Sequence, residues 1–433
     1  MKHKEIPSFV MIRQTFDSSE PVQDVHATLR ERLDSFDYDY NDFAGKTVGI
    51  TAGSRGITHI DEMIRDLAAF VKEKGGTPVI FAAMGSHGGG TAEGQREMLR
   101  SLGISEETMG CEVRTSAECQ QYGYTKSGFP VYGNVLASQF DRIILINRIK
   151  MHTDFEADTE SGLLKIMSIG IGNPKGCMNV HRLALVHGYG KAIQETALRF
   201  LDCLPVAFGV ALTENWKHEL DRIEVVAPEN ILERERELLK AVKAQMVRLP
   251  VTEADALLIG WIGKDISGTG MDTKVVGRIG VIGQAEPETP KIKRVTVLDI
   301  TEASHGNAIG IGLADLSTEA VLKKIDVPAT ALNGISSMSP EQSSLPCFAT
   351  DDLDAIKASV ETVGLEDTTE AKVLYIKDTN SLEYMAVSLP LYEDIKDLPQ
   401  IEAVSEPFEL SFDEEGNLLN KWVDHKTLSN IDL

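Results

Sequence analysis

The sequence predicts an α/β fold in which mostly parallel strands alternate with helices. Short apolar runs at 46–51, 77–83 and 142–146 lead into glycine or polar residues, as buried strands do. Between the first two runs, apolar side chains recur at helical spacing over 60–74, and Gly75 follows. A strand, a helix and a second strand in this order need a crossover connection, which produces a parallel sheet.

The same alternation returns in the second half of the chain. Apolar runs at 254–260, 295–300 and 371–376 predict three further strands. A charged amphipathic segment at 230–248 precedes them, and we expect a solvated connecting helix there.

This helix marks a boundary between two α/β domains, over 1–246 and 247–389. We expect the acidic tail, 390–433, to pack back on the first domain, and the active-site cleft to lie between the two domains.

The composition excludes several classes of function. Of 433 residues, 42% are hydrophobic, and 43 Lys and Arg face 66 Asp and Glu, a net charge of −23. Nucleic acids and anionic membranes attract positive charge, so neither is an expected partner. No apolar run reaches about 18 residues, the N-terminus lacks a signal-peptide pattern, and five scattered cysteines form no disulfide framework. We expect a cytoplasmic protein.

The first motif that can carry chemistry is TAGSRGI at 51–57. Ser54, Arg55 and backbone N–H groups at a strand end can hold a phosphate. The motif resembles the nucleotide loop of short-chain dehydrogenases, and Tyr122 and Lys126 have the spacing of their catalytic pair. That interpretation is rejected because position 58 is Thr and the Tyr–Lys pair lies among turn residues.

Two histidines follow predicted strands. His87 lies in MGSHGGG (84–90), where glycines allow a ligand to approach the backbone, so it is a candidate base. His152 lies in NRIKMHTDF (147–155), among polar and cationic residues that follow the third strand.

A lysine in an apolar segment is the next candidate. Lys165 lies in LLKIMSIGIG, where a charged side chain is costly unless it is paired, exposed or used covalently. His181 follows sixteen residues later, and His187 is six residues further, which is not the spacing of a helical zinc pair. In the second half, WIGKDISGTGMD (261–272) offers Lys264, a carboxylate and hydroxyls, which suits a small anionic substrate.

Together these segments resemble the nickel-dependent lactate racemase family, in its broader branch of 2-hydroxyacid racemases and epimerases. The residues that carry the resemblance are GSRGI (53–57), AMGSHGGGTAEGQ (83–95), NRIKMHTDF (147–155), SGLLKIMSIGIGNPKG (161–176) and GKDISGTGMD (263–272). The resemblance extends over residues 45–390. It implies two α/β domains and an isomerase.

The resemblance also implies a cofactor. Family members carry a nickel pincer nucleotide (pyridinium-3,5-bisthiocarboxylic acid mononucleotide nickel), and Lys165 matches the lysine to which it is tethered. His181 matches the nickel ligand, and His87 and His152 match the two catalytic histidines. Ser54 and Arg55 match the loop that contacts the cofactor and substrate. Lys264 matches a catalytic lysine on the carboxylate side of the substrate. Enzymes of cofactor synthesis in the same cell are implied partners.

Two departures from the family put lactate in doubt as the substrate. Lactate racemases carry Asp-x-Thr-Arg in the first loop, where this chain has Ala52 and Ser54 before Arg55. They also place a late Trp over the pyridinium ring, and none of the three Trp residues here is an obvious match.

The expected reaction is racemisation or epimerisation of a 2-hydroxyacid by reversible hydride transfer from C2. The hydroxyl proton must be taken on either face, which requires two bases such as His87 and His152. The polar loop after Gly260, which runs on to Arg278, predicts a substrate more polar than lactate. The alternatives are a non-catalytic protein that binds a hydroxyacid or nucleotide and, as the weaker one, a nicotinamide-dependent dehydrogenase. The oligomeric state is not predicted.

Overall fold

The computed structural model describes residues 5–54, 56–419 and 421–422 and divides the chain into two compact units. One unit, here called the N-terminal unit, runs from Ser18 to Met246. The other, here called the C-terminal unit, combines the residues up to Asp17 with those from Val247 onward.

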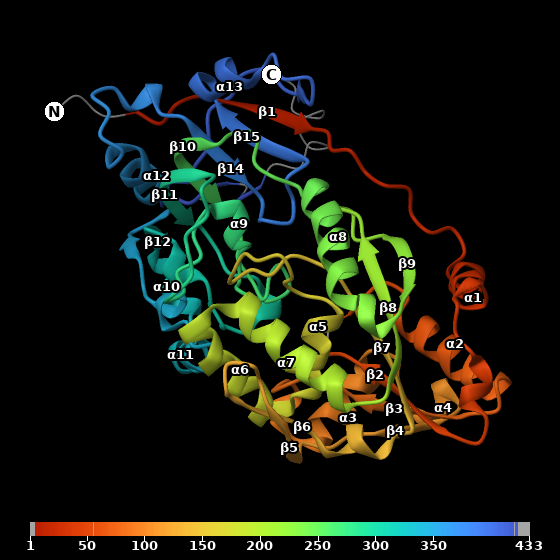
Figure 1. Cartoon of the computed structure of the whole chain (residues 1–433). Helices are drawn as coiled ribbons and strands as arrows, with labels where there is room; N and C mark the ends of the chain where they lie inside the picture. The colour runs from red at the N-terminus through yellow and green to blue at the C-terminus, as the bar shows by residue number, and fades with distance from the viewer. Residues whose placement is uncertain (1–4, 55, 420, 423–433) are drawn as a thin grey trace. The chain divides into compact units, whose positions relative to one another are not determined.

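The N-terminal unit is built on a six-stranded sheet in which only the last strand is antiparallel to its neighbour (Figure 1). In sheet order the strands are β4 (Glu112–Arg114), β3 (Thr77–Ala82), β2 (Thr47–Ala52), β7 (Arg142–Arg148), β8 (Val206–Glu214) and β9 (Leu220–Val226). The helices are α1 (Val25–Ser35), α2 (Ile60–Glu73), α3 (Ala92–Ser101), α4 (Glu106–Met109), α5 (Leu163–Lys165), α6 (Asn173–His187), α7 (Tyr189–Cys203) and α8 (Ile231–Ala244).

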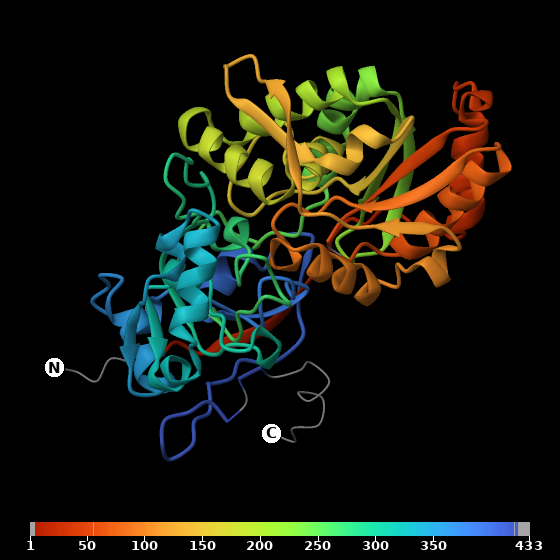
Figure 2. The same ribbon diagram turned by 90° about the horizontal axis from the view of Figure 1, so that it is seen from below.

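Side chains along each strand alternate between the two faces of the sheet, and helices cover both faces. Ile50, Ile80 and Ile144 point from three neighbouring strands into one core with apolar residues of α1 and α2. On another part of the sheet, Gly209 leaves room for Leu163, which would lie 2.6 Å from a Cβ at that glycine. Figure 2 shows α3 in orange on one side of the sheet and α6 and α7 in yellow-green on the other.

A two-stranded antiparallel hairpin, β5 (Cys119–Tyr124) and β6 (Pro130–Asn134), covers α6 and α7. Gly176 of α6 lies so close to this hairpin that a Cβ there would be 2.2 Å from the Tyr132 carbonyl oxygen. The segment that carries Tyr122 and Lys126 is therefore a hairpin and turn, not the long helix of a dehydrogenase.

The C-terminal unit contains an eight-stranded mixed sheet. In sheet order the strands are β13 (Cys347–Ala349), β12 (Leu316–Thr318), β11 (Lys291–Val297), β10 (Glu253–Ile259), β14 (Val373–Ile376), β15 (Tyr384–Ser388), β1 (Phe9–Gln14) and β16 (Ile401–Ala403). The first five strands run parallel to each other, and β15, β1 and β16 each pair antiparallel with the strand before them in this order. Its helices are α9 (Thr273–Val276), α10 (Glu319–Lys324), α11 (Val327–Ser336), α12 (Asp352–Glu361) and α13 (Leu389–Ile395).

The α/β class and its mostly parallel sheets are therefore as predicted, but the ends of the chain differ from the expectation. Strand β1, expected in a domain over 1–246, lies between β15 and β16 in the C-terminal sheet. Its side chains Val10 and Ile12 complete the core of that sheet, which explains why β1 belongs to the C-terminal unit. The described part of the tail accordingly packs in the C-terminal unit, and not on the residues from Ser18 to Met246.

Helix α8 also differs from the solvated connection that was expected. Ile231, Glu235, Leu238 and Leu239 are buried, so one face of the helix packs inside the N-terminal unit. No helix among the described residues combines the length and the apolar character needed to cross a bilayer.

Candidate active site

Three loops with candidate residues emerge at one edge of the N-terminal sheet. Strands β3, β2 and β7 are parallel neighbours, so their carboxyl ends lie together. Ser54 follows β2, His87 follows β3 and His152 follows β7. The strand order thus gathers residues that are almost one hundred positions apart in the sequence.

The first two loops are joined by a hydrogen bond between the Ser54 hydroxyl and Nδ1 of His87. The His87 side chain is exposed, and a loop of three glycines that all have positive φ follows it. These conformations favour glycine, so the turn keeps bulky side chains away from the imidazole. Arg55, the next predicted site residue, lies outside the described residues.

Lys165 ends the short helix α5 and is followed by a π-helical segment, Ile166–Ile171. The Lys165 side chain is half-buried. The two loops reach this segment: Gly85 donates a backbone hydrogen bond to Gly170 O (3.1 Å), and a Cβ at Gly53 would lie 3.8 Å from Ile166. The segment directly after Lys165 therefore lies against the strand-end loops that carry Ser54 and His87.

His181 lies on α6 with its Nδ1 2.8 Å from the hydroxyl of Tyr189. Burial, aided by the positive charge of Lys165, lowers the pKa of His181 to about 4. The imidazole is thus neutral at pH 7, as a metal ligand must be. Because Tyr189 engages Nδ1, Nε2 is the nitrogen suited to a metal, and the hydroxyl would orient the ring.

A series of aromatic rings connects His181 with His152. The Tyr189 ring stacks on Phe155, with centroids 4.9 Å apart and planes 9° from parallel. Phe155 in turn stacks on His152 at 4.5 Å and 24°. Since Phe155 and Tyr189 are both buried, the two histidines are held in one packed cluster.

His152 is mostly covered, with 19% of its side chain exposed. Its Nδ1 accepts a hydrogen bond from the backbone N–H of Asp154 (3.1 Å). A backbone N–H can only donate, so in the neutral ring the proton is on Nε2. The Asp154 carboxylate, 3.9 Å from Nδ1, is the nearby acceptor for a proton at that nitrogen.

The residues present fit a metal group that brings its own donors. Among the described residues, no group of three or more His, Cys, Asp or Glu side chains could hold a metal ion. A metal at His181 would have one neutral imidazole from this chain's described residues, and its further ligands would come from a cofactor. The buried hydroxyl of Ser168, without a hydrogen-bond partner in the structure, lies in the π-helical segment after Lys165.

Lys264 belongs to the C-terminal unit, where it follows β10. Its Nζ donates to Gly268 O (2.6 Å) and to the side-chain oxygen of Asn333 (3.0 Å). The half-buried ammonium is held in a fixed place by these two acceptors.

Other polar groups of that loop are engaged in structural bonds. Arg278 donates to the carbonyl oxygens of Leu313 (2.8 Å) and Ile292 (3.1 Å) and pairs with Asp315 (2.8 Å). Thr269 donates to Met271 O at 2.7 Å. Arg278 and Thr269 thus close the loop on itself and on the sheet, and a role for them in binding a substrate stays a prediction.

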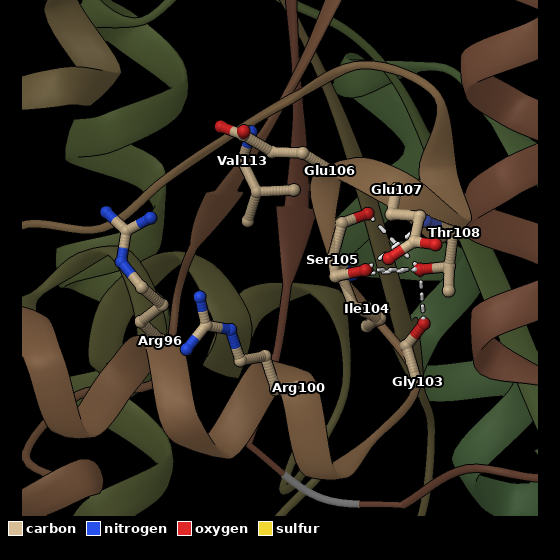
Figure 3. Close-up of a pocket in the computed structure, with 9 residues that line it drawn as sticks. All are labelled: Arg96, Arg100, Gly103, Ile104, Ser105, Glu106, Glu107, Thr108 and Val113. Carbon is tan, nitrogen blue, oxygen red and sulfur yellow. Dashed lines mark hydrogen bonds between the residues drawn. The ribbon is translucent and has the colours of Figure 1, made fainter.

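The hollow in Figure 3 lies elsewhere, between α3 and α4 of the N-terminal unit. It is lined by Arg96, Arg100, Gly103, Ile104, Ser105, Glu106, Glu107, Thr108 and Val113. The hydrogen bonds drawn there include those that cap the start of α4, where Ser105 and Thr108 bond reciprocally. None of the predicted site residues lines it.

The fold and the strand-end cluster define an α/β protein with a polar site at the carboxyl edge of a parallel sheet. A family model, the lactate racemase N-terminal domain, matches residues 51–192. Over these residues the chain is similar to the lactate racemase N-terminal domain, as the family resemblance predicts. The match includes Ser54, His87, His152, Lys165 and His181.

A solved structure supports the same fold. The lactate racemase apoprotein from Thermoanaerobacterium thermosaccharolyticum aligns with 86% of this chain and 99% of its own, at 13% identity and a TM-score of 0.52. No curated protein sequence matches the chain.

Two members of the cluster were not predicted from the sequence. Phe155 and Tyr189 join His152 to His181, yet each is an ordinary aromatic residue in its own segment. The position of Tyr189, eight residues after His181 and across the α6–α7 turn, gave no local signal.

Proposed function

We propose that this protein is a racemase or epimerase of a 2-hydroxyacid, which acts by reversible hydride transfer from C2. The observation that supports this most is the packed cluster of the N-terminal unit. There a neutral, buried His181 and the charge of Lys165 lie near each other, and stacked rings lead to His152. A protein that only binds a hydroxyacid has no need for this combination.

Lys165 and His181 are the residues proposed to hold a nickel pincer nucleotide, with Lys165 as the covalent tether and His181 as the nickel ligand. When bound, this cofactor supplies an electrophile that accepts and returns a hydride. Ser54 and Arg55 are proposed to contact the cofactor and the adjacent end of the substrate.

The two histidines are proposed as the groups that exchange the substrate hydroxyl proton. His87 can begin as the base, because the Ser54 hydroxyl can accept a hydrogen bond from Nδ1–H, and in that neutral tautomer Nε2 carries no proton. His152 begins with its proton on Nε2 because the Asp154 N–H occupies Nδ1. The resting protein thus presents one acceptor and one donor, as two-sided proton exchange requires.

Lys264 is proposed to bind the substrate carboxylate. Its ammonium is already oriented by Gly268 and Asn333, so little side-chain entropy is lost on binding. A substrate more polar than lactate remains the prediction, but it now rests on the departures in the first loop, since Arg278 and Thr269 are engaged. The proposal implies a cytoplasmic enzyme loaded by cofactor-synthesis enzymes of the same cell.

The test compares wild type, Lys165→Ala and a control, Lys175→Ala, each produced with the cofactor-synthesis enzymes. Lys175 is exposed on α6 and lies over the Tyr132 ring. We expect a covalent mass increment and nickel in wild type and in the control, and neither in Lys165→Ala. Exchange of the C2 hydrogen is then assayed with lactate, malate, 2-hydroxyglutarate, phenyllactate and sugar acids. An adduct that persists in Lys165→Ala, or loaded enzyme without exchange on any hydroxyacid, would contradict the proposal.

A further inference from the structure

Helix α8 directs a partly exposed cation, Lys243, at the loop that carries His152. Lys243 Nζ lies 2.6 Å from Oε1 of Glu160 and donates to Ala157 O at 2.9 Å. Glu160 is fully buried, and its Oε2 accepts the backbone N–H of His152 at 2.6 Å. The same carboxylate accepts the N–H of Ala157 (3.2 Å). The position of the His152 backbone thus depends on a carboxylate whose charge is balanced by α8.

The same helix directs a buried carboxyl group at the segment that carries Lys165. Glu235 is 1% exposed, and its Oε2 accepts the backbone N–H of Leu164 at 2.9 Å. This bond fixes the first turn of α5, one residue before Lys165. A Cβ at Gly162 would lie 2.5 Å from the Glu235 carboxyl carbon, so the absence of a side chain there lets the carboxyl group in.

These two side chains lie on one face of α8. Residues 235 and 243 are eight positions apart, a little over two helical turns, and the buried Leu239 lies midway between them. The face is therefore apolar in the middle and carries an ionisable group at each end. Burial of Glu235 at one end, and of Glu160 as the partner of Lys243 at the other, is costly for stability alone.

We propose that α8 positions the site, with Lys243 placing His152 through Glu160 and Glu235 placing Lys165 through the N-terminus of α5. This rests on the proposed function for the roles of His152 and Lys165. Glu235, Glu160 and Lys243 are positioning residues, because none of them is a member of the strand-end cluster.

The first experiment addresses Glu235. Glu235→Leu removes both acceptors, Glu235→Gln keeps one, and Glu233→Ala is the control, since Glu233 is exposed on the same helix. We expect amide hydrogen exchange at Leu164 to be roughly tenfold faster in Glu235→Leu, the effect of one lost hydrogen bond. We also expect a reduced fraction of folded chains with the Lys165 adduct. Glu235→Gln should restore both values toward wild type.

A purely structural role would lower the melting temperature but would leave the adduct fraction of folded protein unchanged. Unchanged Leu164 exchange in Glu235→Leu, or a normal adduct fraction in it, would overturn the assignment. So would a Glu235→Gln variant no better than Glu235→Leu.

The second experiment addresses Lys243. In Lys243→Met the Glu160 carboxylate loses its balancing charge, and we expect kcat to fall at least tenfold with KM within about twofold of wild type. The double variant Lys243→Met/Glu160→Gln removes the unbalanced charge and should recover most of kcat. A change confined to KM, or no recovery in the double variant, would overturn the assignment.

Failure of the proposed function would look different. If the protein were not a racemase, no variant and no wild-type sample would exchange the C2 hydrogen. Amide exchange at Leu164 and at His152 would still report whether Glu235 and Lys243 hold these segments, because that measurement needs neither cofactor nor substrate.

Discussion

Two polar loops, one in each unit, both follow a parallel strand but are held in different ways. The loop after β7 (149–162) is fixed by groups from elsewhere in its unit. Ile149 donates to Leu212 O (2.7 Å) and Lys243 reaches Glu160 from α8. In the loop after β10 (261–272), many bonds join residues of the loop to each other, as in the bond from Lys264 to Gly268 O and the bond from Thr269 to Met271 O.

The two loops use their polar groups for different purposes. In the loop after β10, hydroxyls and carbonyl groups satisfy each other, so the number of polar residues says little about a ligand. In the loop after β7, Lys243 of α8 pairs with the buried Glu160, whose carboxylate holds the backbone of His152, which is the arrangement expected of a site that must hold a group accurately.

The largest effect is expected at the two histidines. His152→Ala and His87→Ala should each lower the rate of C2 epimerisation by about 10²–10⁴-fold in both directions, because each direction uses both groups in turn. His305→Ala, in a turn of the C-terminal unit, is the control. Stereochemical assays from each isomer with loaded enzyme measure this. If either variant kept a near wild-type rate, that histidine would not be a proton-exchange group. For His152, this result would remove the functional difference between the loop after β7 and the loop after β10.

The sequence predicted three of the six strands of the N-terminal sheet, β2, β3 and β7, and the candidate residues that follow them. Runs such as 77–83 have both the apolar pattern and the glycine boundary of a buried strand, and the structure has β3 at Thr77–Ala82. Parallel order then brings the strand-end loops together. That step needs the strand order as well as the fold class, so the pairing of His87 and His152 was predicted from the family resemblance.

Other features could not be predicted because they depend on contacts between distant segments. Glu235 and Lys243 belong to a charged amphipathic pattern that is typical of solvated helices, and only tertiary packing buries Glu235 and brings Lys243 to Glu160. Arg278 was assigned to a substrate because its carbonyl and carboxylate partners, among them Asp315, lie on other strands and turns. The pairing of β1 in the C-terminal sheet likewise has no signal in the sequence around β1.

A second prediction tests whether the N-terminal unit contains a carboxyl group that resists ionisation. Burial raises the pKa of Glu235 from about 4.5 to about 7, although the backbone N–H groups of Leu163 and Leu164 oppose the shift. Such a group contributes stability that is present below pH 4.5 and is lost as the pH rises through 7. The free energy of unfolding of wild type should therefore fall by on the order of 3 kcal/mol more than that of Glu235→Gln between pH 4.5 and 8.

Urea unfolding at several pH values measures this difference, with Glu233→Gln as the exposed control on the same helix. Parallel pH profiles for wild type and Glu235→Gln would mean that Glu235 is ionised in the folded protein at neutral pH. In that case α8 would carry a carboxylate, Glu235, at one end of this face and an ammonium, Lys243, at the other.

A third prediction separates Lys264 from the rest of its loop. Lys264→Ala should lower kcat/KM by about 10–10²-fold, the value of one charge-assisted hydrogen bond to a carboxylate. The free energy of unfolding should change little, since Gly268 O can bond to water instead. Steady-state kinetics together with thermal unfolding measure both values. An unchanged kcat/KM would show that the loop after β10 is structural throughout, which would sharpen its contrast with the loop after β7.

The smallest effect is expected at Arg278, and it should be one of stability alone. The guanidinium joins the end of the α9 segment to Leu313 O, Ile292 O and the Asp315 carboxylate, and it is only partly exposed. Arg278→Ala should lower the free energy of unfolding by about 1–2 kcal/mol, because the freed acceptors lie near enough to solvent to bond to water. The kcat/KM of loaded enzyme should stay within about twofold of wild type, and Arg294→Ala, an exposed arginine of the same unit, is the control. A large loss of kcat/KM with unchanged stability would mean that Arg278 contacts the substrate. The loop after β10 would then again support the prediction of a substrate more polar than lactate.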